Sequence, residues 1–203
     1  MANILQNGVF PIQNKIMRLP TVISWSIFLL CWAAAPVLAQ SPEPSASVWH
    51  RAPKRVLQQG GVRVEVYDFE GFRSFLRAPH SDTTYVINWW ATWCKPCVEE
   101  LPHFAELARA MSDKPVKVLL VSMDFSNQLE SRLLPFLTRQ ALPMECIALE
   151  SANASHWIDQ IDRDWSGAIP ATLIYRGEQR IFYEQSFTLD ELRTEVAKFI
   201  TNP

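Results

Sequence analysis

Hydrophobic residues in this chain follow two spacings that alternate from residue 62 onward. Residues 62–67 alternate apolar and polar side chains, which is typical of a strand with one buried face. Residues 84–89 form a continuous apolar run, which predicts a strand buried on both faces of a sheet. The largely apolar residues 116–122 predict a second central strand, and residues 145–149 predict a short added one.

Segments with helical spacing separate these strands. Bulky residues recur at every third or fourth position in residues 69–77, 98–111 and 129–140, which predicts one buried helical face in each. Pro102 lies inside the second segment, where a proline removes a helix hydrogen bond and predicts a kink. A shorter helix is expected over residues 156–162.

The order of elements changes near the C-terminus. Residues 171–175 and 180–183 flank the turn sequence Arg-Gly-Glu-Gln, which predicts an antiparallel hairpin. A capping box that begins at Thr188 opens a last helix, which runs to Ile200. Strands that alternate with helices, followed by a hairpin and a helix, predict an α/β fold with a mixed central sheet flanked by helices.

Residues 1–39 have the composition of a targeting segment. Lys15 and Arg18 precede an uncharged run over residues 19–39. The apolar centre of this run is short for a membrane-spanning helix, and the residues before and at Ala39 suit a cleavage site. Two interpretations stay open: an export signal cleaved near Ala39, and an uncleaved anchor that attaches the protein to a membrane.

Either interpretation places the rest of the chain in an oxidising compartment outside the cytoplasm, such as the bacterial periplasm. Residues 40–60 begin with a Pro- and Ser-rich stretch and are expected to form a flexible linker. Residues 61–203 have a length that suits one domain. The formal net charge of the 203 residues is −2, which gives no indication of nucleic-acid binding.

Cys94 and Cys97 are the residues with the clearest chemistry. They stand between a predicted strand and a predicted helix, so Cys94 is expected at a helix N-terminus. Free N–H groups and the helix dipole stabilise a thiolate there. Because a thiol three residues later can close a disulfide with the first, the pair predicts a redox-active dithiol.

Other uses of two cysteines at this spacing compete with the redox interpretation. Structural zinc takes four protein ligands. His103 and the distant Cys146 are poor candidates for the two ligands needed beside Cys94 and Cys97. Covalent haem attachment needs a histidine where the chain has Val98. A static disulfide stays open as an alternative, although so short a loop would stabilise the fold weakly. No metal and no cofactor are therefore expected.

Two separated motifs carry a family resemblance. Residues 88–97, Asn-Trp-Trp-Ala-Thr-Trp-Cys-Lys-Pro-Cys, resemble the active site of thioredoxin-like proteins. Residues 97–102, Cys-Val-Glu-Glu-Leu-Pro, are similar to the exported TlpA/ResA-type branch, and Ile169–Pro170 resembles the family's cis-proline loop. The resemblance implies a thioredoxin-like fold with a strand-helix insertion over about residues 143–162, before the cis-proline.

The resemblance also implies a role for each of several residues. Cys94, the more exposed thiol, would attack a partner's disulfide, and Cys97 would then release the reduced partner. Trp93 would shield the site and offer an apolar docking surface. Pro170, in the cis form, would present the backbone of Ile169 to an extended substrate segment.

Four further positions are expected to tune the two thiols. Asn88 stands where thioredoxin itself has a buried Asp that assists proton removal from the second thiol. Glu100 is a candidate replacement for that acid, and a solvated helix glutamate is the other interpretation of this residue. Lys95 would favour the first thiolate through its positive charge, whereas Pro96 tends to make such motifs more reducing in this family. The redox potential therefore does not follow from the sequence.

The resemblance implies an exported thiol:disulfide oxidoreductase that acts mainly as a reductase of partner proteins. Its partners would be protein disulfides or dithiols, together with an upstream membrane-bound or soluble electron donor. Apocytochrome c handling is one such role in the family. A disulfide oxidase or isomerase on the same scaffold, and a non-catalytic binding domain with the thioredoxin fold, are the alternatives.

Overall fold

The structure, a computed structural model, describes residues 52–76, 82–150 and 156–200. The targeting segment predicted over residues 1–39 and most of the predicted linker lie outside these residues. The strands of the described part are β1 (Arg55–Gln59), β2 (Val62–Tyr67), β3 (Thr84–Trp90), β4 (Val116–Ser122), β5 (Glu145–Leu149), β6 (Ala171–Arg176) and β7 (Gln179–Tyr183). The α-helices are α1 (Phe69–Phe72), α2 (Lys95–Ala110), α3 (Leu134–Gln140), α4 (Ile158–Ile161) and α5 (Leu189–Ile200).

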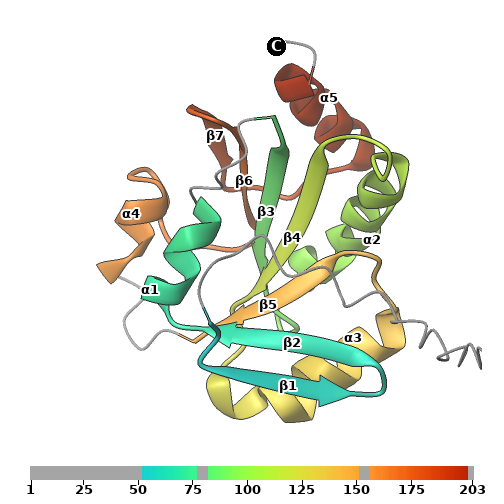
Figure 1. The fold of residues 1–203 in the computed structure, drawn as a ribbon, viewed down its shortest axis with the longest axis vertical. Helices are drawn as coiled ribbons and strands as arrows, with labels where there is room; N and C mark the ends of the chain where they lie inside the picture. The colour runs from blue at the N-terminus through green and yellow to red at the C-terminus, as the bar shows by residue number, and fades with distance from the viewer. Residues whose placement is uncertain (1–51, 77–81, 151–155, 201–203) are drawn as a thin grey trace, which may run out of the picture. The chain divides into compact units, whose positions relative to one another are not determined.

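The strands form one mixed sheet in the order β1-β2-β5-β4-β3-β6-β7 (Figure 1). The strands β2, β5, β4 and β3 run parallel to one another, whereas β1 and the hairpin β6–β7 add antiparallel pairs at the two edges. The predicted α/β class with a mixed central sheet is therefore confirmed.

β1 corrects part of the predicted linker. Residues 40–60 were expected to be flexible, but Arg55–Gln59 pairs antiparallel with β2. The two strands turn through Gly60 and Gly61, whose φ angles of 56° and 81° suit the tight turn of a hairpin. Only Leu57 of this edge strand is buried, so its sequence lacks the apolar alternation that identified β2.

The short strand predicted in the insertion is an internal strand of the sheet. β5 lies between β2 and β4 and runs parallel to both. The β1–β2 hairpin therefore joins the sheet through β5. The helix expected over residues 156–162 is shorter in the structure, where α4 comprises Ile158–Ile161.

Several helix boundaries also differ from the expected ones. α2 begins at Lys95, three residues before the expected start, and continues through Pro102. Residues 69–77 divide into α1 and a 3₁₀ turn over Arg73–Leu76. A short 3₁₀ turn (Ser126–Gln128) and a π-helical turn (Leu129–Leu133) precede α3.

The side chains of β3 divide between two layers of the core. Ile87 and Trp89 pack in a cluster with α1 and α4 on one face of the sheet. Val86 packs with α2 and α5 on the opposite face, and Trp90 lies there in a cluster shared with α2 and α3. Because strand side chains alternate between faces, Asn88 points to the α2 side of the sheet. This places a polar side chain under the helix that carries the cysteines.

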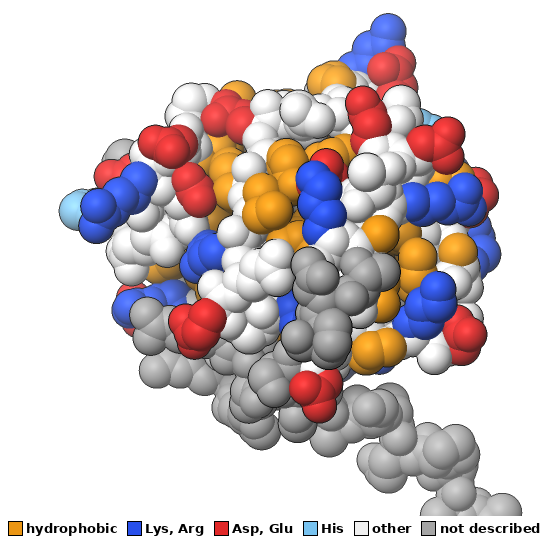
Figure 2. All heavy atoms as spheres, turned by 90° about the horizontal axis from the view of Figure 1, so that it is seen from above, with side chains coloured by type: hydrophobic (Ala, Val, Ile, Leu, Met, Phe, Trp, Pro, Cys, Tyr) orange, Lys and Arg blue, Asp and Glu red, His pale blue; other side chains and the backbone are white. Residues whose placement is uncertain are grey.

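The described residues contain no helix that is both long enough and apolar enough to span a membrane. Figure 2 shows one face of the molecule, on which Lys and Arg side chains are interspersed with Asp and Glu side chains and with hydrophobic atoms.

Candidate redox-active site

The two cysteines stand at the junction of β3 and α2. Cys94 is the N-cap residue of α2, and its sulfur accepts a hydrogen bond from the backbone N–H of Cys97 at 3.3 Å. The two sulfurs form a disulfide with a bond length of 2.05 Å. Cys94 is 6% exposed and Cys97 is fully buried, so Cys94 is the more exposed of the two cysteines. A helix N-terminus favours a thiolate at this position.

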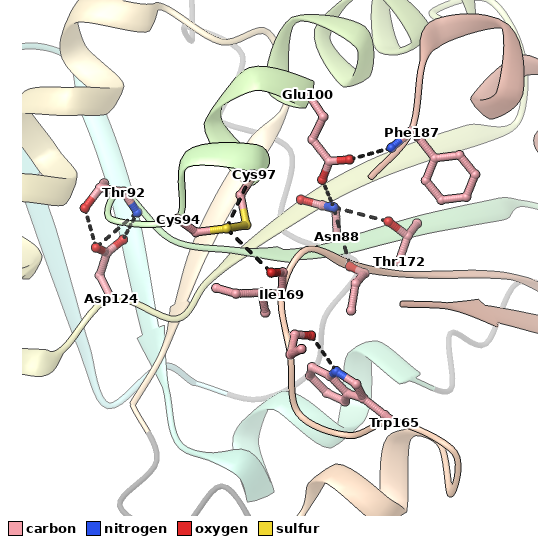
Figure 3. The surroundings of a disulfide bond; sticks show 12 residues. Asn88, Thr92, Cys94, Cys97, Glu100, Asp124, Trp165, Ile169, Thr172 and Phe187 are labelled. Carbon is pink, nitrogen blue, oxygen red and sulfur yellow. Dashed lines mark hydrogen bonds between the residues drawn. A yellow bond between two sulfur atoms is a disulfide. The ribbon is translucent and has the colours of Figure 1, made fainter. Parts of the chain in front are cut away.

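The loop before β6 forms a second wall of the site. The Ile169–Pro170 peptide bond is cis, as the family resemblance implied. The carbonyl oxygen of Ile169 lies 3.7 Å from the sulfur of Cys94 (Figure 3). A disulfide sulfur carries no proton, so this contact becomes a hydrogen bond only when Cys94 is a thiol. Residues 75 positions apart in the sequence thus meet at the reactive sulfur.

Residues after β4 hold the turn that carries Cys94. The N–H of Met123 donates to the carbonyl of Trp90 at 2.7 Å. Asp124, which is 4% exposed, accepts hydrogen bonds from the N–H of Thr92 at 3.1 Å, from the Thr92 hydroxyl and from the Ser122 hydroxyl. Asp124 was not among the predicted site residues, although a polar pair at the end of a buried strand indicates such a contact. These hydrogen bonds fix the turn on the side of Cys94 opposite Ile169 (Figure 3).

Trp93 and Phe125 form a stacked aromatic pair at the surface. Their ring centroids lie 6.1 Å apart with an interplanar angle of 20°. Trp93 is 48% exposed and Phe125 is 61% exposed. The sequence pointed to Trp93 but not to Phe125, because a loop phenylalanine carries no pattern that distinguishes it from a core residue.

Glu100 is buried, which corrects the interpretation of a solvated helix glutamate. It is 2% exposed and lies on the inner face of α2. Its carboxylate accepts hydrogen bonds of 2.9 Å from the backbone N–H of Phe187 and from the side-chain amide of Asn88. Burial raises the pKa of Glu100 to about 7, although these two hydrogen bonds and nearby His103 act in the opposite direction.

Asn88 lies between Glu100 and the disulfide in Figure 3. Its Nδ2 also contacts the hydroxyl of Thr172 at 3.2 Å and the carbonyl of Ala171 at 3.4 Å. Since the carbonyl of Ala171 can only accept, it indicates which end of the amide carries the nitrogen. The amide oxygen has no hydrogen-bond partner among the described residues, and it points toward the disulfide in Figure 3.

Lys95 and Pro96 occupy the first turn of α2. The side chain of Lys95 is 86% exposed, and its ammonium lies 3.6 Å from the carboxylate of Glu99. Solvent and this ion pair screen the charge of Lys95, so its expected effect on the thiolate of Cys94 is weakened. The effects of Lys95 and Pro96 on the two thiols stay predictions.

The remaining cysteine is separate from the redox pair. Cys146 is a free, buried thiol on β5, and burial raises its pKa above the usual range. Across residues 52–76, 82–150 and 156–200, no group of three or more His, Cys, Asp or Glu residues could hold a metal ion.

Most of the described part of the chain matches a known protein family. Residues 53–184 match the model of the AhpC/TSA family. The chain belongs to the AhpC/TSA family. Among its relatives, thiol-disulfide oxidoreductase ResA from Bacillus thuringiensis subsp. konkukian (strain 97-27) is 30% identical over 102 residues, which are 48% of this chain and 53% of ResA. ResA from Bacillus subtilis (strain 168) is 32% identical over 77 residues, 37% of each chain. The chain thus spans about half or less of these relatives.

Solved structures support the thioredoxin-like fold of this AhpC/TSA member. A thioredoxin-related protein from Neisseria meningitidis serogroup B superposes with a TM-score of 0.51 at 20% identity, over 59% of this chain and 86% of that protein. A thioredoxin-family thiol:disulfide interchange protein from Chlorobium tepidum TLS gives 0.50 at 15% identity, over 73% and 94%. The predicted fold and the ResA-type resemblance are therefore confirmed.

Proposed function

We propose that this protein is a thiol:disulfide oxidoreductase that exchanges its Cys94–Cys97 pair with partner proteins. One observation carries the proposal: a reachable sulfur at a helix N-terminus faces the carbonyl of Ile169, which precedes a cis-proline. This arrangement gives a nucleophile, a resolving thiol behind it and a backbone edge for an extended partner segment. The similarity to proteins named ResA supports the same chemistry.

In the reducing direction, the thiolate of Cys94 attacks one sulfur of a partner disulfide. A bond forms between Cys94 and that sulfur, the partner's S–S bond breaks, and the leaving sulfur takes up a proton. The thiolate of Cys97 then attacks Cys94. The Cys94–Cys97 disulfide forms, the mixed disulfide breaks and the second partner sulfur leaves as a thiol. Two electrons have passed to the partner, and an upstream dithiol donor restores the reduced pair.

The surroundings of Cys94 favour its role as the attacking sulfur. The N–H of Cys97 donates to its sulfur, and the N-terminal end of α2 adds partial positive charge. Both interactions stabilise the thiolate relative to the thiol. The buried position of Cys97 keeps it from outside partners, so it reacts only with the sulfur of Cys94.

Glu100 is the proposed proton acceptor for the Cys97 thiol. A carboxyl with a pKa of about 7 exchanges protons readily near neutral pH. Asn88 links this carboxylate to the disulfide side of the sheet, because its Nδ2 binds Glu100 while its unpartnered oxygen points toward the sulfurs. The amide oxygen can accept a hydrogen bond from the Cys97 thiol in the reduced state and so orient its proton.

The proposed setting is an oxidising compartment outside the cytoplasm, in the bacterial periplasm. The predicted targeting segment and the ResA-type resemblance support this setting and the reducing direction. The protein would be released by cleavage near Ala39 or held to the membrane through residues 19–39. Apocytochrome c is one partner that this setting offers. Its cysteines must be reduced before haem is attached to them.

Redox titration of the full-length protein tests the function and its direction. The Cys94–Cys97 couple is equilibrated with dithiothreitol or glutathione, and its potential is read from the fraction of alkylated thiols. A potential near −270 mV, like that of thioredoxin, fits a reductase, whereas one near −120 mV fits the oxidase alternative. Cys146→Ala serves as a control that retains the couple.

Two cysteine variants complete the test. Cys97→Ser should accumulate a mixed disulfide on Cys94 with its protein partners, and Cys94→Ser should accumulate none. If Cys94→Ser supports the biological role as well as the natural chain does, the non-catalytic binding domain is the correct interpretation and the proposed function is wrong.

A further inference from the structure

Exposed aromatic surface is concentrated beside the reactive sulfur. Among the described residues, the large hydrophobic side chains that stand out as exposed are Val56, Trp93 and Phe125. Val56 lies on the edge strand β1, whereas the other two stack on each other next to Cys94. When a partner covers water-exposed aromatic rings, the removal of their apolar surface from water stabilises the complex.

The loop that carries Phe125 is held in place on both sides. Before it, Asp124 is anchored to the turn of Thr92 by hydrogen bonds to the backbone N–H and the hydroxyl. After it, the carbonyl of Phe125 accepts from the N–H of Gln128 at 2.7 Å, which closes a 3₁₀ turn. The backbone at Phe125 is therefore held in place beside the turn that carries Cys94, and its ring stacks on Trp93, as a recognition surface requires.

We propose that Phe125 is a specificity-determining residue that binds an apolar side chain of the partner segment undergoing exchange at Cys94. The inference rests on the proposed function and adds the kind of segment that the site selects. Trp93 and Phe125 together form what we call the aromatic platform.

The position of the platform fixes where the recognised side chain lies in the partner. The partner's chain must deliver a sulfur to Cys94 between Ile169 on one side and the turn of Thr92 on the other (Figure 3). The two rings are 6.1 Å apart, which is about the length of two residues in an extended chain. A side chain that contacts Phe125 therefore belongs to a residue within a few positions of the partner's cysteine.

The charges around the platform favour an apolar contact over an ionic one. Lys95 and Glu99 are both exposed at the start of α2, and they pair with each other. Asp124 is buried and its carboxylate is directed at hydrogen-bond donors of Thr92 and Ser122 rather than at solvent. Neither sign of charge dominates, so selection falls to the aromatic rings. The expected partner segment is extended and carries an aromatic or large aliphatic residue near its cysteine.

Short peptides in mixed disulfide with glutathione test this inference. Two pairs are used, with phenylalanine or glutamine placed two residues before the cysteine in one pair and two residues after it in the other. The reduced full-length protein reacts with each peptide and, separately, with oxidised glutathione, and the second-order rate constants are measured by tryptophan fluorescence. The variants are Phe125→Ser, Phe125→Leu and, as a matched control for an exposed hydrophobic residue, Val56→Ser.

The natural chain should prefer phenylalanine by roughly tenfold in one of the two pairs, which is the ratio that partial burial of one ring provides. Phe125→Ser should reduce that preference to less than about twofold and leave the rate with oxidised glutathione within about twofold. Phe125→Leu should retain part of the preference, and Val56→Ser should retain all of it.

Two results would overturn the inference: equal rates for both members of each pair in the natural chain, or an unchanged preference in Phe125→Ser. In either case, exchange with oxidised glutathione would leave the proposed function standing. If the natural chain reacted with none of the peptide disulfides and not with oxidised glutathione, the proposed function itself would be refuted.

Discussion

Glu100→Gln should remove the pH dependence that a buried carboxyl gives to stability. Glutamine has nearly the shape of a protonated glutamate and cannot ionise. The pKa of Glu100 is about 7 in the folded protein, compared with an ordinary value of 4.5. Between these two values the folded state binds more protons than the unfolded state, so the free energy of unfolding of the natural chain falls as pH rises.

The size of the effect follows from the same two pKa values. Each unit of pKa difference corresponds to about 1.4 kcal/mol, so the full effect is about 3 kcal/mol. The contribution is fully present below pH 4.5 and is lost as pH rises through about 7. Between pH 4 and pH 8, the free energy of unfolding of Glu100→Gln should therefore rise by about 3 kcal/mol relative to that of the natural chain.

Urea unfolding of the oxidised proteins from pH 4 to pH 8 measures this difference. Oxidation removes the titration of Cys94 and Cys97, and other groups cancel because they are common to both proteins. Glu99→Gln, on the exposed side of the same helix, is the control, and it should change the free energy of unfolding by less than about 0.5 kcal/mol. A difference between Glu100→Gln and the natural chain that stays constant from pH 4 to pH 8 would refute the raised pKa.

Three more outcomes are expected. Asp124→Ala leaves the donors of Thr92 and Ser122 without their acceptor, so urea unfolding should show a loss of about 2–3 kcal/mol, and a loss below about 0.5 kcal/mol would contradict this account. Trp89→Ala removes a fully buried ring that packs on neighbouring aromatic residues. Thermal unfolding should show that the free energy of unfolding falls by about 3–5 kcal/mol, and little change would mean that neighbouring side chains fill the cavity. The Cys146 thiol, buried and with a raised pKa, should resist a maleimide at pH 8 in the folded oxidised protein and react in urea. Mass spectrometry of both samples checks this, and labelling in the folded state would show that the thiol is accessible.

Much of the sheet could be predicted because its central strands are buried on both faces. A short, continuous apolar run such as that of β3 is typical of a strand in the middle of a sheet. The sequence patterns of β4 and of the hairpin β6–β7 are equally local. β1 was not predicted, because an edge strand with one buried residue shows no regular spacing of apolar residues. β1 is held in the sheet by its pairing with β2 and by the turn between the two strands. The residues of β1 alone carry no sign of this pairing.

The helix boundaries show a similar division. α2 begins at Lys95 because Cys94 caps it, and that cap depends on the turn held by Asp124. The spacing of apolar residues indicated the body of the helix but not its first turn. In residues 129–140 the period was right, yet the first turn is π-helical, which the spacing does not distinguish from α.

The sequence by itself determined the chemistry that we propose for the site. Two cysteines at this spacing between a strand and a helix, followed by Ile169–Pro170, predict a thioredoxin-like dithiol, because these residue types and their order can be read directly from the chain. Only the tertiary structure decided the environment. It buried Glu100 against Asn88, and it brought Phe125 onto Trp93. Burial and contacts between distant segments depend on how the elements pack, and packing decides whether a carboxyl titrates near neutrality and whether a loop ring reaches the reactive sulfur's neighbour.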